Sequence, residues 1–137
     1  MLKNQVMDYN KLIEYWKFHA NYDMKTAESL LKSKRYPYCL FMCQLALEKV
    51  LKAIVVQKIK THAPYTHDLV RLARIIEIEF SKEQMSYLKE ISGFNIEARY
   101  DNIKMEFHKK ATKSFTEKYF KISNELYLWL EENFLKK

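Results

Sequence analysis

The chain has 137 residues, of which 48% are hydrophobic and 30% are charged, and its formal net charge is +7. This length predicts one domain over residues 1–137, with one hydrophobic core and no room for two. One glycine and two prolines exclude a glycine-rich phosphate loop and leave little material for hairpin turns. We therefore expect an all-α fold, an antiparallel up-and-down bundle of about five helices.

The positive charge indicates either an ordinary basic surface or an anionic partner, such as nucleic acid, a nucleotide or an acidic protein. Lysine supplies most of it, whereas phosphate and base recognition often use arginine. Lys or Glu interrupts every apolar run, so we expect no membrane segment. Cys39 and Cys43 lie one helical turn apart, too close for a useful disulfide. With no signal peptide expected, this pattern favours reduced thiols and a cytoplasmic location.

The first predicted helix runs from about Tyr9 to Ser33 and places Asp23 inside an apolar stripe. A carboxylate on a core-facing stripe needs a partner, or its pKa rises. The second helix has Pro37 in its first turn and continues to about Lys60. It is apolar nearly all round, so we expect it at the centre of the bundle. Its polar side chains fall in one narrow arc: Gln44, Glu48, Lys49 and Lys52.

Three further helices follow. Thr66 is the expected N-cap of the third, and Ser81 with Gln84 predicts a capping box that opens the fourth. Gly93 is expected near the end of the fourth helix. Residues 99–108 lack a clean period and predict a loop or an irregular helix entry. The last helix is expected to begin between residues 109 and 114 and to run to about Leu135.

Arg99, Tyr100 and His108 are the first candidates for chemistry. An arginine and a histidine in one cleft can cleave RNA without metal, because histidine moves the proton and arginine stabilises the phosphorane charge. In the alternative, Arg99 pairs with a buried carboxylate such as Asp23, and His108 is an ordinary surface residue.

Other polar residues have two interpretations each. Lys49 and Lys52 either form an exposed ion-pair strip, with a Glu48–Lys52 pair, or face phosphate in a groove. His67 is either a structural histidine or a catalytic one. The histidines and cysteines do not match the spacing of zinc sites, so we expect neither a metal nor a cofactor: Cys39, Cys43, His62 and His67.

Five segments, in order, resemble one family. They are D-M-K-T-A-E-S-L-L with Asp23, the Q-x-A-x-E-K-x-L-K-A segment from Gln44, T-H-D-L-V-R-L with His67, E-A-R-Y-D with Arg99, and F-H-K-K-A-T-K-S-F-T-E-K-Y. Together they span nearly the whole chain, and they are similar to the HEPN domain, the helical "higher eukaryotes and prokaryotes nucleotide-binding" domain.

The resemblance implies a helical bundle that commonly forms a homodimer, often encoded beside a minimal nucleotidyltransferase in a toxin–antitoxin-like pair. Many HEPN proteins are ribonucleases in which four to six residues lie between an Arg and a His. Here eight residues lie between Arg99 and His108. The chain looks more similar to the nucleotide-binding or partner branch.

We therefore expect a non-catalytic, or at most weakly catalytic, protein that binds a nucleotide or RNA phosphate and partners a nucleotidyltransferase. In this hypothesis Asp23 orients Arg99, and Tyr100 stacks on a base. The phosphate ligands would be Lys49, Lys52 and Arg99. The alternative is a metal-independent ribonuclease toxin that uses Arg99 and His108. A blander alternative is a helical interaction module whose charge complements an acidic partner.

Overall fold

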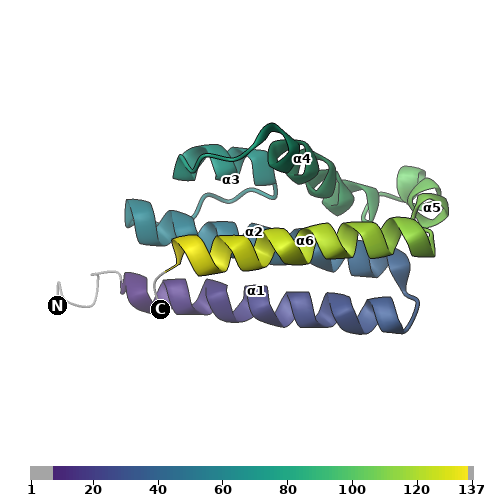
Figure 1. Cartoon of the computed structure of the whole chain (residues 1–137), viewed down its shortest axis with the longest axis horizontal. Helices are drawn as coiled ribbons and strands as arrows, with labels where there is room; N and C mark the ends of the chain where they lie inside the picture. Colours follow the sequence, from purple (N-terminus) through teal and green to yellow (C-terminus); the bar gives the residue numbers. More distant parts are fainter. Residues whose placement is uncertain (1–7, 136–137) are drawn as a thin grey trace.

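The computed structural model describes residues 8–135, with all side chains in that range except those of residues 101 and 102. This part of the chain is all-α and contains no strand (Figure 1). The helices are α1 (Tyr9–Lys32), α2 (Tyr36–Ile59), α3 (Leu69–Ile76), α4 (Lys82–Glu97), α5 (Asp101–Lys110) and α6 (Lys113–Phe134). The all-α bundle is confirmed, with six helices where about five were expected. No helix in residues 8–135 is long and apolar enough to cross a membrane.

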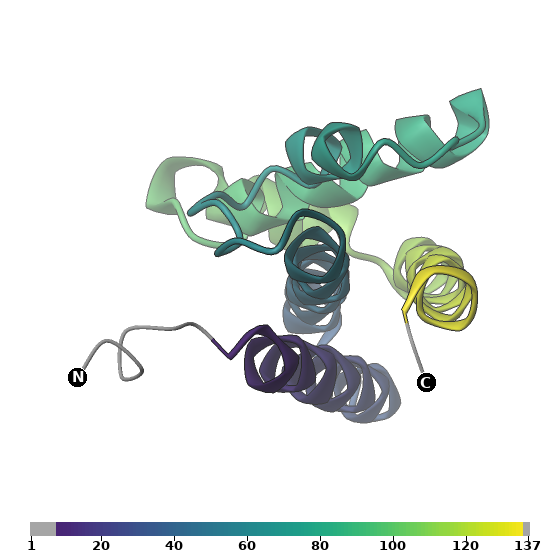
Figure 2. The same ribbon diagram turned by 90° about the vertical axis from the view of Figure 1, so that its left-hand side faces the viewer.

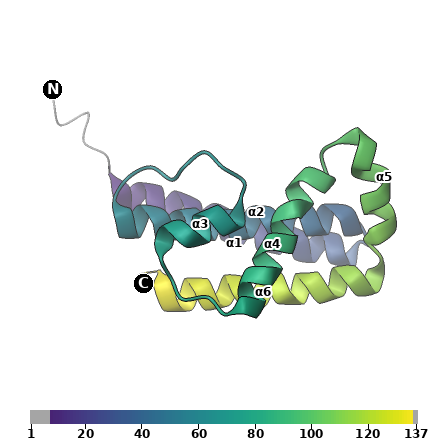
Figure 3. The same ribbon diagram turned by 90° about the horizontal axis from the view of Figure 1, so that it is seen from above.

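Helix α2 lies at the centre of the bundle. Figure 2 shows α1 on one side of it, α3 and α4 on the other, and α6 alongside. Helices α1 and α2 are antiparallel, whereas α6 runs in the same direction as α2 because α3, α4 and α5 return the chain (Figure 3). Gln57 at the end of α2 donates to the carbonyl oxygen of Phe134 at the end of α6, at 2.7 Å.

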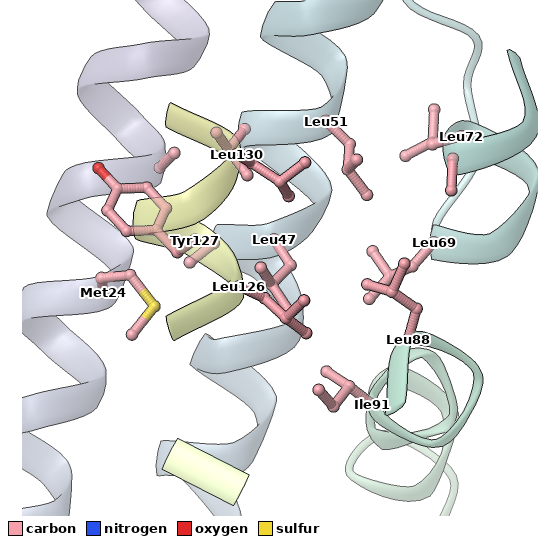
Figure 4. Close-up of a cluster of buried hydrophobic side chains, with 14 of the residues drawn as sticks. Met24, Leu47, Leu51, Leu69, Leu72, Leu88, Ile91, Leu126, Tyr127 and Leu130 are labelled. Atoms are coloured by element: carbon pink, nitrogen blue, oxygen red, sulfur yellow. The ribbon is translucent and has the colours of Figure 1, made fainter. Parts of the chain in front are cut away.

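The core forms where the apolar faces of the outer helices meet α2. Figure 4 shows leucine and isoleucine side chains from several helices in one cluster. The most deeply buried of those it labels are fully inaccessible: Leu47, Leu51, Leu69, Leu72, Leu88, Ile91 and Leu130. Because α2 is apolar nearly all round, it can pack against neighbours on every side, and this accounts for its central position.

Two helix boundaries differ from expectation. The N-cap of α3 is Asp68, whose carboxylate accepts from the backbone N–H groups of Val70 and Arg71, so the prediction of Thr66 was wrong. A carboxylate is also a favourable N-cap because it faces the positive end of the helix dipole. The capping box of Ser81 and Gln84 is confirmed. Gly93 lies about one helical turn before Glu97, the last residue of α4, as expected.

Residues 101–110 form a helix, α5, where a loop or irregular segment was expected. Most of the residues of α5 are polar. Among its described side chains, the hydrophobic one that is buried is Phe107. A helix that buries so little has no clear apolar stripe, which is why its period was missed.

Candidate functional site

The polar arc of α2 is buried and forms the centre of a hydrogen-bond network. Gln44, Glu48 and Lys52 are all at least 94% inaccessible, being 0%, 4% and 6% exposed. Glu48 Oε2 accepts from Lys52 Nζ at 2.9 Å, which confirms the predicted pair but in the interior rather than on the surface. The other oxygen, Oε1, accepts from Gln44 Nε2 at 3.1 Å and lies 2.9 Å from His67 Nδ1. The strip therefore faces the segment before α3, not solvent.

The network continues from the interior to the surface through α4. Gln44 Nε2 also donates to the carbonyl oxygen of His67 at 3.0 Å, and Asn95 Nδ2 donates to Gln44 Oε1 at 2.9 Å. Arg99 Nη1 donates to Asn95 Oδ1 at 3.0 Å. Arg99 is exposed, so an unbroken series of hydrogen bonds joins the buried carboxylate of Glu48 to a surface guanidinium.

The expected pairing of Asp23 with Arg99 was wrong. Asp23 Oδ2 lies 2.6 Å from Lys49 Nζ, and this ion pair links α1 to α2. The reason is geometric, because α1 and α4 lie on opposite sides of α2 (Figure 2). Lys52 is also occupied, since its ammonium group lies 5.2 Å from the centroid of the Trp16 ring in addition to its bond to Glu48. Both lysines thus stabilise the bundle.

A pocket of about 290 Å³ lies against this network, between the start of α3 and α4. We call it the α3–α4 pocket; its lining residues are His67, Asp68, Val70, Lys89, Ser92, Gly93, Asn95 and Ile96. His67 and Asn95 belong to the network as well as to the lining. Nδ1 of His67 contacts Glu48, and the side chain of His67 is still 43% exposed. The buried network therefore fixes the positions of two polar residues of a lining that is otherwise largely apolar.

Tyr100 and His108 lie at the two ends of α5. Tyr100 is the N-cap of that helix, directly after Arg99, and its side chain is 58% exposed. His108 is exposed in the last turn, where its ring meets the ring of Tyr38 edge-on at 6.4 Å. No hydrogen bond joins Arg99 to His108 in the described part of the chain.

Cys39 and Cys43 are free thiols buried against Ala27, and they serve as packing residues. A hydrogen bond from the Cys43 S–H to the sulfur of Cys39, together with burial, raises the pKa of the Cys43 thiol well above its usual value. A buried thiol with a raised pKa is typical of a structural cysteine rather than a reactive one. Within residues 8–135, no group of three or more His, Cys, Asp or Glu side chains is arranged to hold a metal ion.

Sequence reasoning missed Asn95 and Lys89. A signal for Asn95 was present, because it follows Leu88 and Ile91 at helical spacing and so falls on the buried face of α4. A polar side chain at such a position needs a buried partner, here Gln44. Lys89 carried no such signal, since exposed lysines are common in this chain.

Comparison with known proteins agrees with this architecture. The family model for the HEPN domain matches residues 13–133. The chain belongs to the HEPN domain family. The crystal structure of TT1696 from Thermus thermophilus has a similar fold, with a TM-score of 0.76 and 16% sequence identity over 88% of this chain and 96% of that chain. No curated protein matches this HEPN chain.

Proposed function

We propose that this HEPN protein binds a nucleotide, or a phosphate of RNA, at the α3–α4 pocket, with Arg99 as the main phosphate ligand. The observation that carries the proposal is the network from Glu48 to Arg99. It holds the Arg99 guanidinium through Asn95, a neutral amide, and no carboxylate among the described side chains pairs with Arg99. A positioned, exposed guanidinium retains its full charge and its remaining donors for an anion.

The surroundings of Arg99 suit the rest of a nucleotide. Lys89 and His67 add two basic side chains at the pocket, and Val70 and Ile96 add apolar surface against which a base can lie. Tyr100, directly beside Arg99, is exposed enough to stack on a base. Lys49 and Lys52 are left out of this phosphate site because each is held by a carboxylate.

The likeness to the nucleotide-binding branch of the family extends the proposal to a partner. We infer that the protein acts beside a minimal nucleotidyltransferase in a toxin–antitoxin-like pair and does not itself cleave RNA. Two features of the sequence support this inference. Tyr100 follows Arg99 directly, and no histidine lies at the distance from Arg99 that the ribonucleases of the family use. The family includes ribonucleases, so the alternative that uses Arg99 and His108 is tested separately below.

The test is titration calorimetry of the full chain with ATP and with a short single-stranded RNA. Arg99→Ala should weaken binding of either ligand by about tenfold or more, because a charge-assisted hydrogen bond contributes about 1.5–3 kcal/mol. Arg74→Ala, at an exposed arginine outside the pocket, is the matched control and should bind as the wild type does. If neither ligand binds the wild type, or if both variants lose affinity equally, the proposed site is wrong.

A further inference from the structure

A second pocket lies where the first turns of α4 cross the second half of α6 (Figure 3). Its volume is about 260 Å³, and we call it the α4–α6 pocket. Four of its lining residues decide its chemistry: Glu83 and Tyr87 of α4, and Glu125 and Trp129 of α6. None of the described residues that line it is a lysine, an arginine or a histidine. In a chain with 24 Lys and Arg but 17 Asp and Glu residues, this pocket has the opposite charge.

The two walls of the pocket carry the same pattern. On α4, Tyr87 follows Glu83 by four residues, and on α6, Trp129 follows Glu125 by four residues. Helical residues with this spacing share a face and lie about 6 Å apart along the axis. Each wall therefore presents a carboxylate and, about one turn further on, an aromatic ring.

Neighbouring rings hold both aromatic side chains in place. The ring of Trp129 meets Phe80 and Phe134 edge-on, with centroids 5.6 Å and 5.1 Å apart. The ring of Tyr87 meets Tyr119 edge-on at 6.2 Å. Both Trp129 and Tyr87 are partly buried, so packing restricts their rotation while part of each stays accessible. The aromatic surface of the pocket is thus formed before anything binds there.

The two carboxylates are available to a ligand. Glu83 and Glu125 are exposed, and neither forms an ion pair or a hydrogen bond with any side chain or backbone group in residues 8–135. Glu83 lies in the first turn of α4, where it also offsets the positive end of the helix dipole. Glu125 lies in the interior of α6, and the dipole gives no reason for a carboxylate there. Lys121, one turn before Glu125, does not pair with it.

We propose that the α4–α6 pocket binds an alkyl diammonium ion, with Glu83 and Glu125 each accepting hydrogen bonds from one ammonium group. Bonds between an ammonium group and a carboxylate are charge-assisted and therefore among the stronger ones. The methylene chain then lies against Tyr87 and Trp129, whose ring faces also attract a cation. A divalent metal ion would use the carboxylates alone, and calcium takes about six to eight oxygen ligands.

The volume of the pocket suits a short linear diamine. An apolar cavity of about 150 Å³ can hold a benzene-sized molecule. The 260 Å³ of the α4–α6 pocket therefore accommodates 1,5-diaminopentane, which exceeds benzene by a single heavy atom. Since the carboxylates belong to different helices, a ligand with a charge at each end can reach both, whereas the side chain of a lysine has one ammonium group.

The test is titration calorimetry of the full chain with 1,5-diaminopentane at pH 7 and low ionic strength, because salt screens exposed charges. The wild type should bind it with a Kd of about 1 mM or tighter, and Glu125→Gln should weaken binding by about tenfold. Tyr87→Leu should also weaken it. The matched control is Glu117→Gln, an exposed glutamate of α6 outside the pocket lining, which should bind as the wild type does. The neutral analogue 1,5-pentanediol should not bind.

Three results would overturn the inference. They are no binding of 1,5-diaminopentane to the wild type, equal losses in Glu125→Gln and Glu117→Gln, and binding of 1,5-pentanediol as tight as that of the diamine. Nα-acetyl-lysine amide, a mimic of a lysine on a partner protein, should bind more weakly than the diamine. If it binds equally well, the second ammonium group has no role and the diamine assignment is wrong. Glu125→Gln should retain ATP binding, so this proposal and the proposed function can fail separately.

Discussion

Glu48 is the residue on which most of the buried network depends. Its two oxygens contact Lys52, Gln44 and His67, and its side chain is only 5% exposed. A buried ion pair is costly to desolvate, so it stabilises a fold only when every polar group in it is satisfied. Removing the carboxylate alone would leave the Lys52 ammonium group buried without its counter-charge.

We expect Glu48→Gln to lower the free energy of unfolding by about 3 kcal/mol, as measured by urea denaturation, because breaking one side of a buried pair leaves an uncompensated charge. Glu14→Gln is the control: Glu14 lies 3.3 Å from Lys17, but its side chain is 70% exposed. Such a surface pair contributes less than about 1 kcal/mol. The double variant Glu48→Gln with Lys52→Met should recover part of the loss. Equal effects at Glu48 and Glu14 would contradict the network.

At the scale of the helix, the sequence predicts which face of a helix is buried more reliably than it predicts which side chains will pair. The narrow polar arc of α2 placed this helix at the centre of the bundle, and the structure confirms that position. The predicted partner of Asp23 was wrong. A core-facing carboxylate indicates that a cation lies nearby, but it does not indicate which helix supplies that cation. Here the cation came from the neighbouring α2, as Lys49.

The same limit applies to the candidate site. Arg99 and His67 could be singled out from residue type and order, but the α3–α4 pocket could not. It depends on how α3 sits against α4, and that arrangement is set by tertiary packing of faces whose local pattern is ambiguous. Helix α5 was missed because its mostly polar residues form no apolar stripe with a helical period.

Gly93 gives a prediction at this scale. It lies in the interior of α4 and lines the α3–α4 pocket, and an added Cβ would meet no atom within 4 Å. Gly93→Ala should therefore raise the free energy of unfolding by about 0.5–1 kcal/mol, since alanine loses less backbone entropy in a helix. The same methyl group, which lies at the pocket, should weaken ATP binding several-fold if the base rests there.

Ser86→Ala is the control for Gly93→Ala, because Ser86 is exposed on the same helix and outside the pocket lining. It should leave ATP affinity unchanged. Calorimetric titration and thermal unfolding of both variants would measure the two effects separately. A Gly93→Ala variant that is destabilised would mean that the backbone or its neighbours do not tolerate a side chain there.

At the scale of the whole molecule, α2 separates the face formed by α1 from the face formed by α3 and α4 (Figure 2). Arg99, through its bond to Asn95, and the α3–α4 pocket belong to the face formed by α3 and α4. Between Tyr100 and His108 runs α5, which at 1.5 Å per residue separates these two residues by about 12 Å along its axis. Acid–base cleavage of RNA needs the histidine and the arginine within hydrogen-bond reach of one phosphate.

This geometry predicts that the purified protein does not cleave RNA in the presence of EDTA. Incubation with single-stranded RNA should leave the wild type and His108→Ala indistinguishable on a denaturing gel, beside a commercial metal-independent ribonuclease that cleaves in the same buffer. Arg99→Ala should still reduce RNA binding, which separates a ligand role of the arginine from a catalytic one. EDTA-resistant cleavage by the wild type that is lost in His108→Ala would establish a ribonuclease. It would also require an interface that brings α5 of one subunit to Arg99 of another.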